Sequence, residues 1–187
     1  IIFSFDLIST NHDVIEGIYN TTAGGPSKAS TVGTWIGQYP SGQGPNVCID
    51  LSATTCINFG NVGLNPSGST NTAGVGTGLY TIPSVGVSIV RGIQFQAGGD
   101  YPARDPLTIT LEGSNDTGSA LTLGTSWTLL YSGDTGLVPF SVTRLAWGDI
   151  QNFTNTIAFT AYRMIITSQR GIDYCVQFAE MNLYGYL

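Results

Sequence analysis

The sequence is short of charge, and its six Lys and Arg residues are half as many as its twelve Asp and Glu residues. Only 10% of its 187 residues are charged, Lys28 is the only lysine, and the formal net charge is −6. The basic residues are spread along the chain and form no stripe: Lys28, Arg91, Arg104, Arg144, Arg163 and Arg170. Such a protein would be repelled by nucleic acids and by anionic membrane surfaces. We therefore expect no nucleic-acid partner.

Long apolar runs and helical periodicity are missing as well. A transmembrane helix needs about 18 or more consecutive apolar residues. The apolar N-terminal run IIFSFDLIST is too short for that and is interrupted by Asp6. No segment of ten or more residues places its apolar side chains at helical spacing. The sequence thus predicts no membrane span and no helical core.

The groups that most hydrolases need are also lacking. The only histidine, His12, lies in a polar stretch without a motif, whereas a catalytic nucleophile needs a base held beside it. There is no G-x-S-x-G motif, and the GVGTG segment at 74–78 lacks the strand-to-helix context of a phosphate-binding loop. A glycosidase needs two facing carboxylates, and the sequence does not single out a pair among its twelve acidic residues. We expect a protein that is not an enzyme.

What the chain does contain favours an all-β fold. It has 25 glycines and 8 prolines, with Thr, Val, Ile, Tyr and Phe abundant between Gly-rich turns. From Leu107 to Leu111 apolar and hydroxyl side chains alternate, which is the period of a strand with one buried face. Strand-like runs recur along the chain: IIFSFDLI, TCINFG, GLYTIP, GVSIVRGIQFQAG, PLTITLEGS, SWTLLYSG, TIAFTAYRMIITS and CVQFAEMNLYGY. About eight strands in one domain predict a β-sandwich with jelly-roll topology.

Three cysteines and three glycosylation motifs bear on the cellular location. Cys48 and Cys56 are eight positions apart around a turn-like segment, a spacing that a disulfide can close; the alternative is two buried thiols. Cys175 is then left over, either buried or linked to another chain. The N-x-S/T motifs lie at Asn20, Asn115 and Asn152. Together with the scarcity of lysine, these features favour an extracellular protein.

In the second half of the chain, five motifs follow one another in an order typical of a known family. A strand ends in Ser and a polar turn, then a Trp-bearing strand and a Tyr-Arg strand follow, and the closing strand carries Glu before an apolar-Tyr-Gly ending. The order resembles that of the discoidin or coagulation factor 5/8 type C family, whose galactose-binding-like sandwich is shared with many carbohydrate-binding modules. The matching residues are Ser114 to Asp116, Trp127, Tyr162–Arg163, Glu180 and the LYGY segment at 183–186.

The resemblance covers roughly residues 45 to 187, with Asp50 and Thr55 in the places of the family's opening segment. The chain departs from the family pattern in its cysteines at 48 and 56 and in the long loop from Asn61 to Gly76. Residues 1–44 have no counterpart. We therefore expect a single domain, 1–187, made of a discoidin-like part, 45–187, and an N-terminal extension or first strands, 1–44.

The resemblance also implies a structural Ca²⁺, held in the family by an Asp of the opening loop, a Ser/Thr hydroxyl and a Glu near the C-terminal strand. Carried over to this chain, the ligands are Asp50, Thr55 and Glu180. Irregular loops supply the oxygen atoms that Ca²⁺ prefers. The alternative is that Asp50 caps a turn while Glu180 pairs with an arginine such as Arg163.

Ligands of the resembled family meet loops at one end of the sandwich, which correspond to 61–76 and 97–105 in this chain. An aromatic platform beside planar hydrogen-bonding groups suits a sugar, and the second loop offers both: Asp100, Tyr101, Arg104 and Asp105. The alternative is that Tyr101 and Pro102 pack as a plug and that Arg104 pairs with Asp105. Weaker candidates for ligand contact are Trp35, Tyr39 and Arg170.

Two functional hypotheses follow. The first is a non-catalytic, extracellular carbohydrate-binding or adhesion module, with glycans or glycoproteins as partners. The second is a structural subunit of an extracellular filament or sheath, in which the apolar N-terminal strand adds to the sheet edge of a neighbour. The first predicts a monomer, and the second predicts a homo-oligomer whose size depends on concentration.

Overall fold

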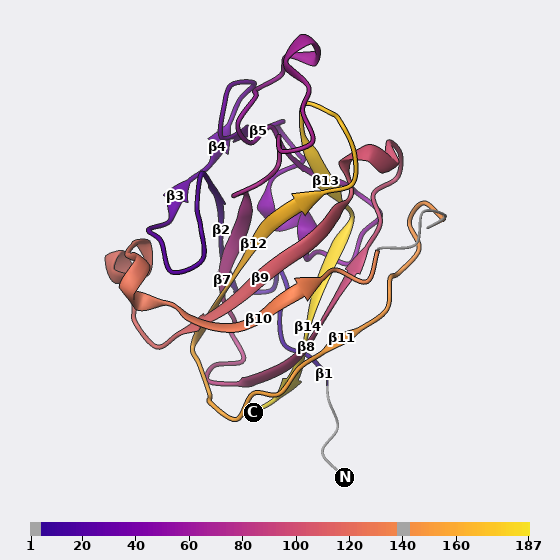
Figure 1. Ribbon diagram of the computed structural model, residues 1–187. Coiled ribbons are helices and arrows are strands. Elements are labelled where there is room, and N and C mark those ends of the chain that lie inside the picture. The colour runs from indigo at the N-terminus through magenta and orange to yellow at the C-terminus, as the bar shows by residue number, and fades with distance from the viewer. Residues whose placement is uncertain (1–4, 138–142) are drawn as a thin grey trace.

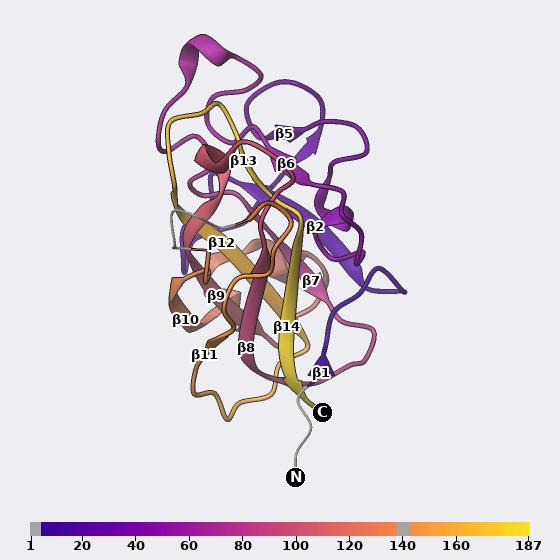
Figure 2. The ribbon, with the colours of Figure 1, turned by 90° about the vertical axis from the view of Figure 1, so that its right-hand side faces the viewer.

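Strands supply most of the regular structure of the computed structural model, which describes residues 5–137 and 143–187. Two antiparallel sheets pack against each other (Figure 1, Figure 2). The six-stranded sheet has the order β10 (Thr128–Asp134), β9 (Pro106–Ser114), β12 (Ala161–Gln169), β7 (Gly78–Ile82), β2 (Val14–Tyr19) and β3 (Lys28–Ala29). The four-stranded sheet has the order β1 (Phe5–Asp6), β14 (Glu180–Tyr186), β8 (Ile89–Gln96) and β11 (Gln151–Asn152).

Two short strand pairs complete the architecture near one end of the sandwich. The antiparallel pair joins β13 (Val176–Phe178) to β6 (Cys56–Asn58), and the parallel pair joins β4 (Thr31–Val32) to β5 (Gln38–Tyr39). The helices of the described residues are all short 3₁₀ turns: η1 (Pro45–Cys48), η2 (Pro66–Gly68), η3 (Pro102–Arg104), η4 (Gly118–Thr122) and η5 (Gly124–Ser126). Within the described ranges, none of them has the length and apolar character of a membrane span.

The core lies between the two main sheets and follows from the period of two along their strands. Ile109 and Leu111 of β9 point inward from the six-stranded sheet, and Ile93 of β8 and Leu183 of β14 meet them from the other side, all fully buried. Such sandwiches bury the alternate residues of both inner faces in a single apolar layer. The all-β sandwich predicted from the sequence is therefore confirmed.

One long strand of the structure, β2, is not among the runs expected from the sequence. Its residues VIEGIY do not alternate cleanly, and only Ile18 is fully buried among the apolar ones. Gly17 is required by close packing, because a Cβ there would approach the Ser30 Oγ to 2.6 Å and the Pro45 Cγ to 3.2 Å. Residues 14–19 pair with β7 and thus extend the six-stranded sheet.

Both ends of the chain differ in detail from the expected strands. The C-terminal run CVQFAEMNLYGY forms two strands, β13 and β14, which are separated at Ala179 and pair with β6 and β8 respectively. At the N-terminus, β1 pairs with β14, and the Leu7 N–H donates to the Leu183 oxygen at 2.8 Å. Leu7 and Ile8 are buried in the core. Residues 1–4 of the expected N-terminal strand lie outside the described residues.

The disulfide between Cys48 and Cys56 is confirmed, and it joins η1 to β6 with Cα atoms 5.3 Å apart. Cys175 is buried, as one of its two alternatives required. Burial raises the pKa of its thiol to about 12. Because the thiolate is the reactive form, this side chain is poorly suited to form a link with another chain.

Replacing both Cys48 and Cys56 by serine is expected to lower the free energy of unfolding by about 2–3 kcal/mol, because the cross-link constrains a short loop of the unfolded chain. Urea unfolding measures the loss. Reduction of the wild-type protein should give a shift of the same size, which serves as the control. Equal unfolding midpoints for the double variant and the oxidised wild type would contradict the prediction.

The three glycosylation motifs lie at the surface of the molecule. Asn20, Asn115 and Asn152 are all exposed. Asn115 is held in its turn because its side-chain oxygen accepts from the Thr160 N–H at 3.0 Å and its Nδ2 donates to the Ala158 oxygen at 3.1 Å. Use of these motifs stays a prediction.

Candidate binding site on the rim loops

Several long loops gather at the end of the sandwich opposite the chain termini (Figure 1, Figure 2). Loop 61–76 follows β6, loop 97–105 joins β8 to β9, and loop 170–175 joins β12 to β13. The antiparallel pairing of β9 with β12, in which Pro106 lies opposite Gln169, brings the last two loops together, and the Arg170 N–H donates to the Asp105 backbone oxygen at 2.9 Å. We refer to loops 97–105 and 170–175 as the rim loops.

Arg104 of η3 is the side chain that fixes the rim loops. Arg104 is only 6% exposed, and its Nε lies 3.0 Å from the Asp173 Oδ1. Its guanidinium lies 4.0 Å from the ring centre of Tyr101 and 4.8 Å from that of Tyr174. Arginine placed over aromatic faces is stabilised by cation–π attraction as well as by its ion pair. Arg104 therefore supports the loop from the protein interior. Its ion-pair partner is Asp173 and not Asp105, the partner that the alternative interpretation of the sequence proposed.

Asp105 is a second buried support. Both of its carboxylate oxygens accept from Arg144 at 2.8 to 3.1 Å, and Arg170 Nε lies 3.3 Å from Oδ2. Burial raises the pKa of the Asp105 carboxyl to about 6, and the two guanidinium groups oppose that shift. Asp105 and Arg170, which were predicted to contact a ligand, therefore form an ion pair with each other in the protein.

Tyr101 and Asp100 form the part of the rim that faces solvent. Tyr101 is 56% exposed, and its backbone is in the left-handed region with φ of 40°. Gln177 Nε2 donates to the backbone carbonyl oxygen of Asp100 at 2.6 Å and to the Asp100 carboxylate Oδ1 at 2.8 Å. The Tyr101 ring is held in place by Arg104, and the Asp100 carboxylate is oriented by the amide of Gln177, before any ligand binds. Such pre-organisation lowers the entropic cost of binding.

A neighbouring loop that sequence reasoning did not select adds to this surface. In residues 143–149, Arg144 binds Asp105 and Trp147 is 40% exposed. The loop lies along the first rim loop, because the Ala97 N–H donates to the Ala146 oxygen at 3.0 Å and Gln96 Nε2 donates to the Leu145 oxygen at 2.7 Å. The TRLAWGD segment carries one Arg and one Trp among turn residues, which is the signal that could have identified it.

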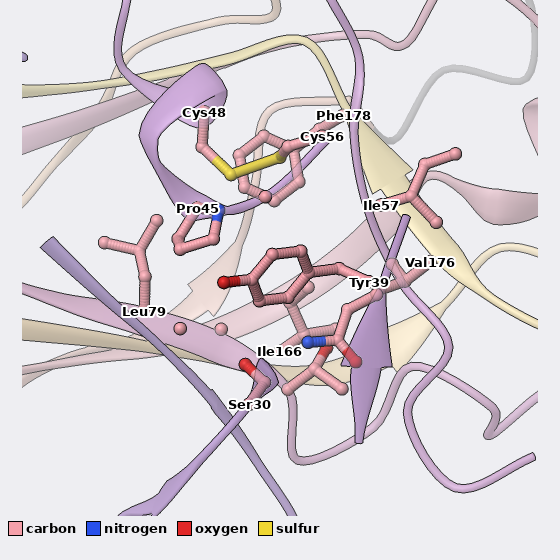
Figure 3. Close-up of a pocket in the computed structure, with 15 residues that line it drawn as sticks. Ser30, Tyr39, Pro45, Cys48, Cys56, Ile57, Leu79, Ile166, Val176 and Phe178 are labelled. Atoms are coloured by element: carbon pink, nitrogen blue, oxygen red, sulfur yellow. A yellow bond between two sulfur atoms is a disulfide. The ribbon is translucent and has the colours of Figure 1, made fainter. Parts of the chain in front are cut away.

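Trp35 and Tyr39 lie on a different part of the same end, and within the described ranges no hydrogen bond, ion pair or ring stacking joins them to the rim loops. Trp35 is 77% exposed on a turn that contacts loop 61–76, where the Leu64 N–H donates to the Thr34 oxygen at 2.7 Å. Tyr39 instead covers an apolar pocket beside Pro45 and the disulfide (Figure 3). That pocket has a volume of about 30 Å³, which is room for a single water molecule and not for a sugar ring.

The three residues predicted as calcium ligands are only partly brought together. Asp50 Oδ1 and Glu180 Oε1 both accept from the Ser52 N–H, at 2.8 and 2.9 Å, so Asp50 does cap a turn. Burial, and then the hydrogen bond with Asp50, raises the pKa of Glu180 to about 8. Glu180 Oε2 is buried without a hydrogen-bond partner among the described residues. The pairing of Glu180 with Arg163 that was the alternative does not occur, because Arg163 binds Glu112.

Thr55 is turned toward the rim loops. Its hydroxyl accepts from the Gly99 N–H at 3.1 Å, and its carbonyl accepts from Gln43 Nε2 at 3.2 Å. The disulfide loop 48–56 is thereby tied to loop 97–105. No group of three or more His, Cys, Asp and Glu side chains in the described part of the chain is arranged to hold a metal ion. A cation at Asp50 and Glu180 would thus need backbone or hydroxyl oxygens besides the two carboxylates.

Solved structures of low sequence identity share this fold. A family 32 carbohydrate-binding module of NanJ from Clostridium perfringens, solved in complex with galactose, has a TM-score of 0.56 and 11% identity, covering 97% of this chain and 99% of that chain. Chitosan-binding module 1 of a chitosanase/glucanase from Paenibacillus sp. IK-5 has a TM-score of 0.51 and 17% identity, covering 97% and 99%. A SusE-like protein has a TM-score of 0.63 and 12% identity, covering 99% and 68%.

These likenesses confirm the fold that the order of motifs predicts, a galactose-binding-like jelly-roll sandwich. No protein-family model matches the sequence, and no curated protein is significantly similar to it. The fold is therefore established by structure, and what the chain binds has to be argued from its own residues.

Proposed function

We propose that this protein is a non-catalytic, extracellular carbohydrate-binding module whose ligand site lies on the rim loops. The observation that carries the proposal is the exposed ring of Tyr101, fixed from beneath by Arg104 and flanked by the oriented carboxylate of Asp100. A sugar presents an apolar C–H face that packs on such a ring and hydroxyl groups that donate to such a carboxylate. Structures of the same fold have been solved with galactose and described as chitosan-binding, which supports glycans as the ligand class.

Replacing Tyr101 by alanine is expected to weaken glycan binding at least about tenfold, since the loss of a stacked aromatic ring costs on the order of 1.4 kcal/mol. Titration calorimetry with galactose, N-acetylgalactosamine and chitosan oligosaccharides, selected after a glycan array, measures the change. Tyr101→Phe keeps the ring and should retain most of the affinity. Trp35→Ala removes an exposed ring elsewhere on the same end and should change little.

Two results would overturn the proposal. One is the absence of binding to any glycan of the array at millimolar sugar. The other is binding that survives Tyr101→Ala but is lost in Trp35→Ala, which would move the site to the turn beside loop 61–76. Unfolding curves of the variants distinguish loss of contact from loss of structure, because both side chains are largely exposed.

We also propose a structural Ca²⁺ at Asp50 and Glu180. Two adjacent carboxylates with an unpartnered buried oxygen fit a hard divalent cation, which prefers carboxylate and carbonyl oxygens. When bound, the ion would neutralise both carboxylates and stiffen the disulfide loop 48–56, which contacts loop 97–105 through Thr55. Its contribution to the rim would be indirect, through the support of that loop.

The filament hypothesis has less support from the structure. It needs the N-terminal strand to pair with a neighbour, yet β1 is paired with β14 of its own chain, and Leu7 and Ile8 lie in the chain's own core. If β1 were to leave its own sheet and join that of a neighbour, these contacts would have to open. Light scattering at increasing protein concentration would test it, and the carbohydrate-binding proposal predicts a constant monomer mass.

A further inference from the structure

A bulge in β8 creates an unusual surface on the outer face of the four-stranded sheet. Val90 and Ile93 both face the core. Two residues, Arg91 and Gly92, lie between them, where a regular strand would have one outward-facing residue. The pairing with β14 shifts at the same place, where Tyr184 opposes Gly92 and Gly185 already opposes Val90. An extra residue of this kind bends a strand and re-aims a side chain. The bulge places the Arg91 side chain next to Gly92, which has no side chain.

The two bulge residues, Arg91 and Gly92, line a depression of about 270 Å³ together with Asn152, Phe153, Tyr184, Gly185 and Tyr186. Gly92 leaves the floor open: a Cβ there would lie 3.3 Å from the Ile150 Cγ2, 3.4 Å from the Asn152 Oδ1 and 3.5 Å from the Tyr184 Cβ. We call this depression the sheet-face site. It lies on a different surface from the rim loops, which project from the end of the sandwich (Figure 2).

The aromatic walls of the sheet-face site are held in place. The Tyr184 hydroxyl donates to the Gln94 Oε1 at 2.8 Å, and Gln94 Nε2 donates to the Gly148 oxygen at 2.9 Å. Phe153 stacks on Tyr131 with ring centres 5.3 Å apart. Rings that are fixed before binding lose little conformational freedom when a ligand packs on them.

Arg91 gives the sheet-face site its charge. Of the five arginines, Arg104 pairs with Asp173, Arg144 and Arg170 pair with Asp105, and Arg163 pairs with Glu112. Arg91 is exposed and has no acidic partner within residues 5–137 and 143–187. None of the residues that line the depression is acidic either. In a protein with a net charge of −6, this leaves one guanidinium available to a negatively charged group.

We propose that the sheet-face site binds an acidic sugar, a pyranose ring that carries a carboxylate. A carboxylate matches the planar fork of Arg91 through two parallel hydrogen bonds. The C–H face of the ring would pack on the tyrosine walls, and the Asn152 amide, whose Oδ1 lies beside Gly92, suits ring hydroxyls. The site is independent of the rim loops, so the two proposals stand or fall separately.

The test is an amide NMR titration of the isotopically labelled protein with D-galacturonic and D-glucuronic acid, compared with D-galactose and D-glucose, up to about 50 mM because single sugars bind weakly. The acidic sugars should shift the amide signals of Gly92, Asn152 and Tyr184. Arg91→Gln should weaken their binding at least about tenfold, and Arg91→Lys should restore only part of it because the fork is lost. The protein is made in a host that does not N-glycosylate, because a glycan on Asn152 would fill the depression.

Matched controls separate this site from the rest of the molecule. Lys28→Gln removes the same charge from an exposed position and should leave the titration unchanged, and so should Tyr101→Ala on the rim loops. The proposal is overturned if the acidic sugars cause no shifts around Gly92, if Arg91→Gln binds them as the wild type does, or if Lys28→Gln weakens binding equally. Loss of binding in Tyr101→Ala alone would assign acidic sugars to the rim loops instead.

Discussion

The Arg163→Met variant is expected to lose about 3–5 kcal/mol in free energy of unfolding, the cost of leaving one member of a buried ion pair without its partner. Arg163 is fully buried, with its Nε and Nη2 at 2.8 and 2.7 Å from the Glu112 Oε2. The two residues face each other in register on β12 and β9. Methionine fills much of the same volume but leaves the Glu112 carboxylate uncompensated in the protein interior.

The same pair also ties a distant loop to the sheet. Arg163 Nη1 donates to the Gly25 oxygen at 2.9 Å and to the Ser27 Oγ at 2.7 Å, and Glu112 Oε1 accepts from the Gly24 N–H at 2.7 Å. The segment between β2 and β3 is thus held by groups at the middle of the six-stranded sheet. Arg163→Met should therefore increase amide exchange at Gly24 as well as lower the urea midpoint.

A double variant provides the control for this prediction. Glu112→Gln with Arg163→Met leaves no buried charge, so it should recover a substantial part of the loss despite having one more substitution. Ser27→Ala removes only one hydrogen bond and should cost about 1 kcal/mol. A loss below about 1 kcal/mol in Arg163→Met, or a double variant less stable than the single one, would show that the pair does not stabilise the fold in this way.

Strands with a clear alternating or continuous apolar pattern were predictable from the sequence, and strands shaped by close packing were not. β9 alternates apolar and hydroxyl side chains, and β12 carries a run of buried side chains at the middle of the sheet. Both strands were expected where they occur. β2 lies at the side of the same sheet, where Gly17 accommodates Ser30 and Pro45, so its apolar pattern is interrupted. The split of the C-terminal run at Ala179 depends on which sheet each half joins, and a local pattern does not contain that information.

The candidate site divides along a similar line. The loop that holds Asp100 to Asp105 was selected through the resemblance to the discoidin-type family, and its residues were selected because an aromatic residue, charges and a proline gather there. The partners of its charges were not, since Asp173, Arg144 and Gln177 reach this loop from other elements. With twelve acidic and six basic residues, pairing is decided by the register of the strands. Sequence reasoning therefore found the loop but not which of its charges are supports and which face solvent.

In the absence of Ca²⁺, the protein is expected to become less stable as the pH rises from about 5 to about 8. Glu180 has its pKa raised from 4.5 to about 8, so between these values the folded state holds a proton that the unfolded state has released. The contribution of this proton to stability is therefore fully present below the pKa that Glu180 has in the unfolded chain. It is lost as the pH rises through the pKa that Glu180 has in the folded protein. Burial raises the pKa of Asp6 to about 6, which adds to the fall at the lower end of this range.

Added Ca²⁺ should reverse this trend, because the ion favours the ionised form of both Asp50 and Glu180 and competes with the proton. At about one hundred times its dissociation constant, a ligand that binds only the folded state stabilises it by about 2.7 kcal/mol. For a chain of this length that corresponds to a rise of roughly 5–10 °C in Tm. The rise should be larger at pH 8 than at pH 5.5, where protons occupy the site. Scanning calorimetry in EDTA and in excess CaCl₂ measures both curves.

Glu180→Gln is the decisive variant for this linkage. It removes the titrating proton and one ligand, so the curve in EDTA should flatten between pH 6 and pH 8 and the response to Ca²⁺ should disappear. Glu16→Gln, at an exposed position on β2, should behave as the wild type. If the wild type loses stability with rising pH but does not respond to Ca²⁺, the buried Glu180 carboxyl is a proton site and the calcium proposal fails. If the EDTA curve of the wild type is flat, Glu180 is already ionised at neutral pH, and the electrostatic argument for a cation beside Asp50 fails with it.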